Sequence, residues 1–323
     1  MLFDIDIKEN ELLEKDPKTM ELLLKDKNSK GNIIWATNDY KSKGDGYEYF
    51  SQITLESITG EHGTTIRPRV SKSKSEKEFR SRDKGEVFTP AWVCNKQNNL
   101  IDDATLGYSG AFNSEIERGW ITNQDRIVFP SPSGITWQDY VCSTRLEITC
   151  GEAPYLVSRY DALTGELIPV EERIGILDRK LRVVTENVAD AKQWITWAKK
   201  AFQSTYAFEW QGDSLLLARE NLLISFKEFY RAAFKKDATL TACRQIAEII
   251  SWNVWQMDAL KGVIPGSCHD DVIKTESLFE TEERIVECVG CEKNDIHKHN
   301  GIYCYIKDWS TGEVVRFVDI LKA

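Results

Sequence analysis

Three carboxylates stand where the sequence predicts that strands end. Glu147 closes an apolar stretch just before Cys150 and Gly151, Glu209 ends the run YAFE, and Asp258 follows NVWQM. Carboxylate oxygens at such positions could accept hydrogen bonds from the hydroxyls of a ribose and from an exocyclic amine. Each acid taken alone could equally be a solvated strand terminus, so the interpretation depends on the elements that carry the acids.

The chain between residues 145 and 260 alternates strand-like and helix-like segments. Ile174, Leu177, Leu181 and Val184 recur at helical spacing between two of the short apolar runs. The order strand, helix, strand, helix, strand predicts a parallel sheet with crossover helices. Ligands of such sheets bind beyond the carboxyl ends of the strands, so acids at three successive strand ends predict a binding site there.

Length, composition and charge describe a well-packed globular protein. The 323 residues allow one large or two modest domains, and 41% of them are apolar. A net charge of −9 disfavours a generally cationic coat for nucleic acid, although a local basic face could still bind phosphate. The sequence has no apolar run long enough for a membrane span and no signal-peptide pattern. Eight cysteines without an export signal predict reduced thiols and a cytoplasmic location.

A local basic surplus occurs at residues 67–84. This stretch, RPRVSKSKSEKEFRSRDK, holds eight Lys or Arg against three Asp or Glu. Such a run is either a solvated loop or an arm that contacts DNA phosphates, whose binding would weaken with salt. The candidate DNA-contacting residues are Arg67, Arg69, Lys72, Lys74, Arg80 and Arg82.

Cysteine and histidine cluster near the C-terminal end in CVGCEKNDIHKHNGIYC. Zinc takes four nitrogen or sulfur ligands in a tetrahedron, and a C-x-x-C pair followed by histidines could supply them. The candidate ligands are Cys288, Cys291, His297, His299 and Cys304. The alternative is a reduced cysteine pair on a loop with solvent-exposed histidines.

Four segments in order resemble S-adenosylmethionine-dependent DNA adenine-N6 methyltransferases, and the whole chain resembles bacterial and phage proteins labelled restriction-modification "subunit M". KGEVFTPAWV (84–93) resembles their F-x-T-P element, and LEITCGEAPYL (146–156) resembles their cofactor loop. YAFEWQGDSLLLARENLL (206–223) and NVWQMDAL (253–260) resemble the two elements that follow. The resemblance covers over half of the chain.

The resemblance implies that S-adenosylmethionine is the cofactor. It makes Glu209 the ribose ligand, makes Asp258 the adenine contact, and places the F-x-T-P element over the methionine end. The implied cofactor-binding residues are Phe88, Thr89, Pro90, Glu147, Cys150, Gly151, Ala153, Glu209, Asp213 and Asp258.

The sequence also departs from that family. Its cofactor loop contains one glycine, and the tetrapeptide Asn/Asp/Ser-Pro-Pro-aromatic, which holds the flipped adenine, is absent. The catalytic residues are therefore unknown, and Asp308 with Trp309 is the one weak substitute. Residues 259–323 are too few for the second half of the fold.

Together these patterns predict an α/β protein. We expect a Rossmann-like class I methyltransferase core that is incomplete in its second half at 84–262, an N-terminal α+β extension with a basic arm at 1–83, and a small β appendage at 263–323. One hypothesis is a DNA adenine-N6 methyltransferase or one part of a split enzyme completed by a partner subunit. The other is a catalytically inactive module that binds DNA or a protein, and a structural α/β protein with surface acids is the third.

Overall fold

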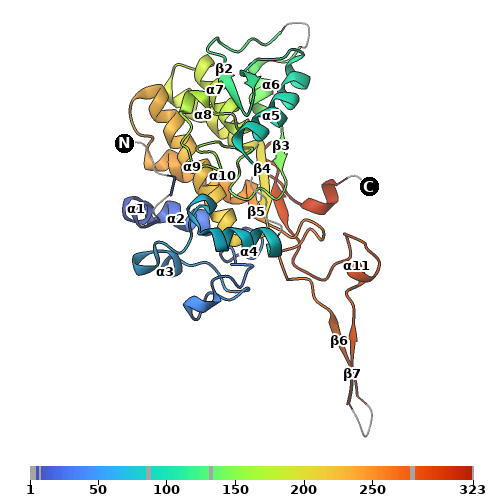
Figure 1. Cartoon of the computed structure of the whole chain (residues 1–323). Helices are drawn as coiled ribbons and strands as arrows, with labels where there is room; N and C mark the ends of the chain where they lie inside the picture. Colours follow the sequence, from blue (N-terminus) through green and yellow to red (C-terminus); the bar gives the residue numbers. More distant parts are fainter. Residues whose placement is uncertain (1–4, 7–8, 85–88, 131–133, 277–280, 322–323) are drawn as a thin grey trace.

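Three short parallel strands lie at the centre of the computed structural model (Figure 1). The structure describes residues 5–6, 9–84, 89–130, 134–276 and 281–321. The strands are β3 (Arg145–Glu147), β4 (Thr205–Glu209) and β5 (Val254–Gln256), in the order β3-β4-β5. Both neighbouring pairs are parallel, which confirms the predicted α/β class and the predicted direction of the strands.

Two pairs of helices make the crossovers between these strands. They are α7 (Ile176–Asn187) and α8 (Ala191–Gln203), then α9 (Gly212–Phe234) and α10 (Leu240–Asn253). Asp190 and Thr239 cap the starts of α8 and α10 by accepting hydrogen bonds from the backbone N–H groups of Gln193 and Ala242. The alternation predicted for residues 145–260 is therefore confirmed, with two helices in each crossover.

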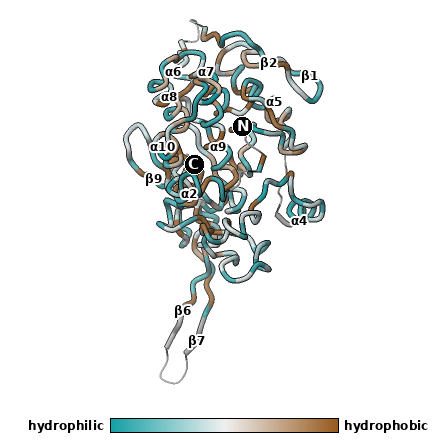
Figure 2. Tube along the Cα trace, turned by 90° about the vertical axis from the view of Figure 1, so that its left-hand side faces the viewer, coloured by the Kyte–Doolittle hydropathy of each residue, from teal (hydrophilic) through white to brown (hydrophobic). Residues whose placement is uncertain are grey.

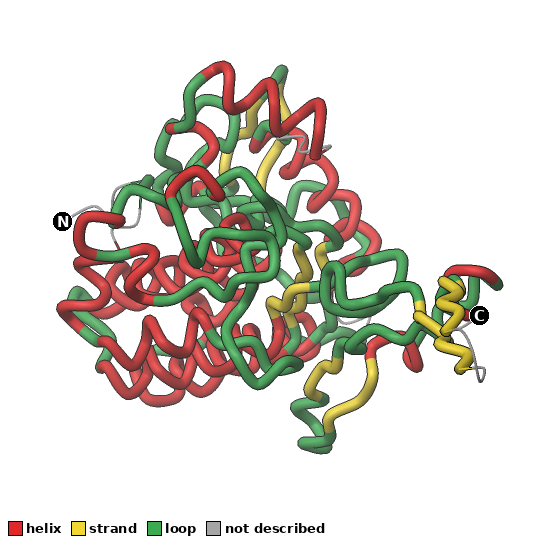
Figure 3. The backbone as a smooth tube through the Cα atoms, turned by 90° about the horizontal axis from the view of Figure 1, so that it is seen from below, coloured by secondary structure: helices red, strands yellow, loops and turns green. Residues whose placement is uncertain are grey.

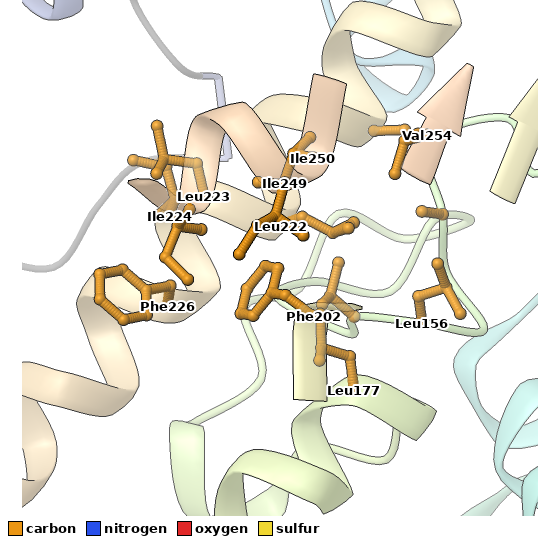
Figure 4. Packing of buried hydrophobic residues seen from close by; sticks show 14 of the residues in the cluster. Leu156, Leu177, Phe202, Leu222, Leu223, Ile224, Phe226, Ile249, Ile250 and Val254 are labelled. Carbon is orange, nitrogen blue, oxygen red and sulfur yellow. The ribbon is translucent and has the colours of Figure 1, made fainter. Parts of the chain in front are cut away.

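The main hydrophobic core lies around α9. Leu222 and Phe226 of this helix pack with Phe202 of α8 and with Ile249 and Ile250 of α10 (Figure 4). Residues of α9 are buried on every side through most of its length, as expected for a helix that other helices surround. Seen from below, most of the helices lie away from the C-terminus, which is on the other side of the central strands (Figure 3).

The N-terminal region packs into this same core. Its helices are α1 (Glu9–Lys15), α2 (Pro17–Leu24), α3 (Leu55–Ile58) and α4 (Lys74–Lys84). Met20 and Trp35 are fully buried members of the core cluster. The buried Arg219 guanidinium of α9 donates hydrogen bonds to the carbonyls of Leu23 and Val254, so it ties α2 to β5.

Two further segments connect these regions. Residues 32–40 form isolated bridges from Asn32 to Lys25 and from Ile34 to Gln52, and Ala36 in this segment takes a left-handed φ of 51°. The described part of the stretch 84–145 contains α5 (Ala91–Leu106), the hairpin β1 (Asn113–Ile116) with β2 (Gly119–Thr122), and α6 (Trp137–Cys142). Helix α5 buries Asn95, Asn98 and Asp102, so its inward face is polar and shows no apolar periodicity.

The C-terminal segment forms small antiparallel pairs, as its sequence predicts. The hairpin of β6 (Asp271–Glu276) and β7 (Thr281–Val286) projects away from the body of the molecule (Figures 1 and 2). The segment continues with α11 (Val289–Glu292) and with the pair of β8 (Tyr305–Lys307) and β9 (Val314–Arg316). None of the described helices combines the length and the hydropathy that a transmembrane span requires.

Gly212 at the start of α9 allows the N-terminal segment to lie against the end of β4. Its N–H donates to the carbonyl of Trp35 at 3.0 Å, and a Cβ at this position would lie 2.1 Å from the carbonyl oxygen of Ile34. The backbone at Ile34 is further held by two hydrogen bonds with the Gln256 side chain. A side chain at position 212 would therefore have to displace the backbone at Ile34 and Trp35, which the Gln256 side chain and the Gly212 amide hold in place.

We predict that Gly212→Ala lowers the free energy of unfolding by about 1–3 kcal/mol, because the added methyl group overpacks this contact. Urea unfolding followed by circular dichroism measures the change. Gly119→Ala is the matched control, since its Cβ would meet only the Ile116 side chain at 3.4 Å. Equal stability of the two variants would contradict the close packing at Gly212.

Candidate functional site

The parallel register brings the predicted acids to one edge of the sheet. Glu147 is the last residue of β3 and lies opposite Ala207, while Glu209 is the last residue of β4 and lies opposite Gln256. Asp258 follows β5 by two residues, and the Met257 amide donates to the carbonyl of Glu209 at 3.0 Å. We call Glu147, Glu209, Trp210 and Asp258 the sheet-edge site.

The loop after β3 alternates in backbone handedness. Thr149, Gly151 and Ala153 have φ values of 48°, 54° and 63°, in the left-handed region that is costly for residues other than glycine. Successive amides in such a conformation face a common concavity that suits an anion. Here the Gly151 amide donates to the Glu209 carboxylate at 2.8 Å, so Glu209 holds the loop.

Gly151 serves the loop through its positive φ. A Cβ built there would meet no described atom within 4 Å, so the space beside this glycine is open. The neighbouring Cys150 and Ala153 are buried, and the Cys150 amide donates to the carbonyl of Phe208 at 2.9 Å. These two residues anchor the loop to the sheet.

The Glu147 carboxylate faces the interior. Burial raises its pKa well above the usual value, and the nearby Glu209 charge adds to this, while the amides of Tyr155 and Leu156 donate to it and act in the opposite direction. The residue as a whole is partly exposed, but its Oε2 atom is buried, and no group in the described part of the chain donates a hydrogen bond to that atom. A buried acceptor without a donor is costly, so a ligand that donates there would be favoured.

Glu209 keeps acceptor capacity beyond its internal bonds. Its Oε2 accepts from the Gly151 amide at 2.8 Å and its Oε1 from the Gln211 amide at 3.3 Å. Burial raises the pKa of this carboxyl, and the same amides oppose the rise. The Trp210 amide also donates to this carboxylate, so three of its four acceptor sites are occupied and one remains for a ligand.

An aromatic surface lies beside Asp258. Trp210 directly follows Glu209 and exposes 37% of its surface. Its indole N–H donates to the Tyr49 hydroxyl, and the pKa of Tyr49 is raised mainly by burial and further by the Asp258 charge. Asp258 is buried and accepts from the Leu260 amide at 3.0 Å. The sequence-based reasoning missed Trp210, although its position after Glu209 was a usable signal.

The F-x-T-P segment approaches the same edge. Pro90 precedes the first residue of α5, and the Thr89 side chain makes a hydrogen bond with the Tyr155 hydroxyl. Tyr155 also provides one of the two amides that donate to Glu147. Phe88, which was expected to join this segment, lies outside the described residues.

Asp213 is committed to an internal ion-pair network. Its fully buried carboxylate accepts from Arg80 at 2.8 Å, from Lys72 at 3.3 Å and from the Tyr40 hydroxyl at 2.7 Å. Burial alone would raise the pKa of Asp213, but the two cations hold it well below its usual value. Asp213 was expected to bind the cofactor; the structure gives it cationic partners from the N-terminal region instead.

The expected basic arm is therefore partly internal. Lys72 and Arg80, expected to meet DNA, are buried beside Asp213 because an ionised carboxylate inside the protein requires paired charges. Arg67 pairs with Glu76 at 3.3 Å, and Arg69 contacts Ser81 and the Lys77 carbonyl. Lys74 and Arg82 of α4 are exposed.

Asp308 and Trp309 lie at the opposite end of the sheet from the acids. The Trp309 indole donates to Asn253, the residue that precedes β5, at 2.7 Å. Asp308 accepts from the Ser310 amide and hydroxyl in the turn between β8 and β9. Since Asn253 marks the amino end of the strand, these two residues do not join the sheet-edge site.

Four side chains in the C-terminal segment could hold a metal ion. Their ligand atoms lie within 4.8 Å of one another, and they are Cys268, Cys288, Cys291 and His299. We call them the cysteine–histidine cluster. His299 Nδ1 lies 3.6 Å from the sulfurs of Cys268 and Cys291 and 3.8 Å from that of Cys288.

Backbone amides already support thiolate character at one ligand. The Asn300 amide donates to the Cys288 sulfur at 3.3 Å, and the Cys291 amide also donates to it. Burial opposes ionisation, yet these donors and His299 lower the pKa of Cys288 to about 6. A low thiol pKa favours metal binding because the thiolate is the ligand form.

The cluster differs from the predicted ligand set in three residues. His297 pairs with Asp319 at 3.4 Å, and Cys304 is fully buried with its thiol donating to the Gln256 carbonyl, so neither belongs to the cluster. Cys268 replaces them, although it precedes Cys288 by a whole hairpin. The signal for it was a lone cysteine upstream of the C-x-x-C pair.

Comparisons with known proteins give no match: no protein-family model, no curated protein and no solved structure matches this chain.

We predict that Arg80→Met lowers the free energy of unfolding by about 3–5 kcal/mol, because it leaves the Asp213 carboxylate buried with one partner fewer. Lys74→Gln, on the exposed side of the same helix, should change stability by less than about 0.5 kcal/mol. Chemical denaturation of both variants makes the comparison. An Arg80→Met protein as stable as Lys74→Gln would contradict the internal network.

We predict that Glu147→Gln becomes stabilising relative to the wild type as the pH rises. The folded-state pKa of Glu147 is raised, so the wild type loses stability from the unfolded-state pKa of about 4.3 upward, towards its folded-state pKa. The glutamine cannot ionise and avoids this loss. Denaturation curves of both proteins at about pH 4 and about pH 8 test this prediction. A stability difference between the two proteins that does not change with pH would contradict the buried carboxyl.

Proposed function

We propose that this chain is a methyltransferase-like protein that binds S-adenosylmethionine at the sheet-edge site. The observation that carries the proposal is the buried Glu147 Oε2, which no group in the described residues satisfies. The α-amino group of the methionine moiety is a cationic donor that suits this atom. The proposed core is the cofactor half of a Rossmann-like methyltransferase fold, with its first strand at the edge of the sheet.

The remaining residues of the site fit the nucleoside end of the same ligand. Glu209 retains one acceptor site for a ribose hydroxyl beside the three amides that donate to it. Trp210 is partly exposed and would stack on the adenine, and Asp258, whose charge acts on the Trp210 partner Tyr49, would accept from the adenine amine. A planar surface with a few placed polar groups is the usual composition of a nucleoside pocket.

DNA is the substrate class that we propose, with adenine N6 as the methyl acceptor if the protein is active. A second candidate is a catalytically inactive module that binds DNA or a protein partner, and the missing Asn-Pro-Pro-aromatic tetrapeptide favours it. A partner subunit that supplies this element would reconcile the two. Exposed Lys74 and Arg82 remain the candidate phosphate contacts on α4.

Zinc is the metal that we propose for the cysteine–histidine cluster. Three thiolates and one imidazole form a preferred tetrahedral set for zinc. Four protein ligands leave no open position, so the ion would be structural and would take no part in methyl transfer. Thiolate ligands need reducing conditions, which fits the cytoplasmic location that we propose.

We predict that S-adenosylmethionine binds the full chain in the micromolar range, as measured by titration calorimetry. Glu209→Gln should weaken binding by about tenfold or more, because the amide has one acceptor oxygen instead of two and carries no charge. Glu171→Gln, which changes an exposed acid outside the sheet-edge site, is the matched control and should bind like the wild type.

Folded wild-type protein that gives no heat of binding would refute the proposed function. Binding without methyl transfer to adenine-containing duplex DNA would support the inactive module. A transfer assay with radiolabelled cofactor distinguishes these outcomes, and it should be run with the wild type and with Glu209→Gln.

A further inference from the structure

We infer that the cysteine–histidine cluster is a zinc clamp on the 258–268 turn, the segment that joins Asp258 of the sheet-edge site to the ligand Cys268. The ion would fasten this turn to the C-terminal segment that supplies Cys288, Cys291 and His299. Its effect on nucleoside affinity rests on the proposed function, whereas its effect on the turn does not.

Two glycines allow the residues of the cysteine–histidine cluster to approach one another closely. A Cβ at Gly290, inside the C-x-x-C pair, would lie 2.6 Å from His299 Nδ1 and 2.5 Å from the His299 amide nitrogen. A Cβ at Gly301 would lie 2.8 Å from the amide nitrogen of Cys268. Neither glycine has a positive φ, so close approach is what requires them. They allow ligands from distant parts of the chain to converge.

The 258–268 turn carries the clamp at its far end and Asp258 at its near end. The Gly262 amide donates to the Asp258 carbonyl at 2.8 Å, and the Ile264 amide donates to the Ile302 carbonyl at 2.8 Å. The Ser267 hydroxyl accepts from the Ile302 amide at 3.0 Å, directly before Cys268. A metal ion that holds Cys268 to the C-terminal segment would therefore also restrain the hydrogen-bonded turn, and with it Asp258.

Lys261 provides a second link between the turn and the cluster. Its amide donates to the Asp258 carbonyl at 3.3 Å, and its ammonium donates to the Cys291 sulfur. A zinc ion carries two positive charges and its three thiolate ligands carry three negative ones. With a neutral imidazole as the fourth ligand, the complex therefore has a net charge of −1. An ammonium beside one sulfur offsets this charge, as groups around metal ligands commonly do.

The clamp predicts a local response to metal removal. Without the ion, three thiols and one imidazole retain only weak sulfur contacts, so coordination no longer holds Cys268 to the segment that supplies Cys288, Cys291 and His299. Amides of the turn should then open more often than those of α9, which the core surrounds.

The test compares full-length protein loaded with zinc and the same protein after chelation under reducing conditions. The loaded protein should contain about one zinc ion per chain. Hydrogen exchange of peptides covering 258–268 should accelerate on the order of tenfold after removal, return with added zinc, and leave α9 unchanged. Unchanged exchange in the turn, or no bound zinc, overturns the clamp.

Variants separate the cluster from its neighbours. Cys268→Ser should lose zinc and the protection of the turn, while His297→Ala, at the histidine outside the cluster, should retain both. His299→Cys preserves four ligands and should retain zinc, which covers the case in which Cys268→Ser does not fold. Zinc retained by a folded Cys268→Ser protein overturns the ligand set.

The link to the sheet-edge site is read from S-adenosylmethionine affinity with and without zinc. Removal of zinc should weaken binding by about tenfold as Asp258 loses its fixed position. Equal affinity overturns the link and leaves the clamp supported by the exchange data. A zinc-loaded protein with a protected turn that binds no S-adenosylmethionine overturns the proposed function and the link, but supports the clamp.

Discussion

The hydrogen bond from the Gly151 amide to the Glu209 carboxylate joins the loop after β3 to the end of β4. It exists because the strands are parallel, so their carboxyl ends meet at one edge. The left-handed residues Thr149 and Ala153 on either side of Gly151 are tolerated because this bond and the buried Cys150 fix the loop. The position of Glu147, and with it the buried unsatisfied oxygen, follows from that loop.

Buried charged groups hold the N-terminal region to α9 and to the central sheet. Arg80 and Lys72 neutralise Asp213 at the start of α9, and Arg219 on the same helix binds carbonyls of α2 and β5. Removal of one partner from a buried ion pair is strongly destabilising, because the other charge then stays buried without compensation. A basic stretch that resembles a nucleic-acid arm in the sequence therefore contributes in part to the interior.

The sequence predicts the central sheet well and the peripheral chemistry less well. The sequence predicts the strand ends near Glu147, Glu209 and Asp258 because apolar runs and helical periodicity are patterns among neighbouring residues. The partners of Asp213 and the ligand Cys268 depend on contacts between residues far apart in the chain, which periodicity cannot show. Helix α5 was missed because its inward face carries amides and a carboxylate that bind Arg179 and backbone carbonyls.

The sheet-edge site carries the functional account, and a crystal structure of the full chain with S-adenosylhomocysteine, which retains the amine, ribose and adenine, tests it most directly. The account predicts the amine at Glu147, a ribose hydroxyl within hydrogen-bond distance of Glu209, and the adenine against Trp210 with its amine at Asp258. Density for the ligand anywhere else, or a structure in which it fails to bind at saturating concentration, would contradict the account.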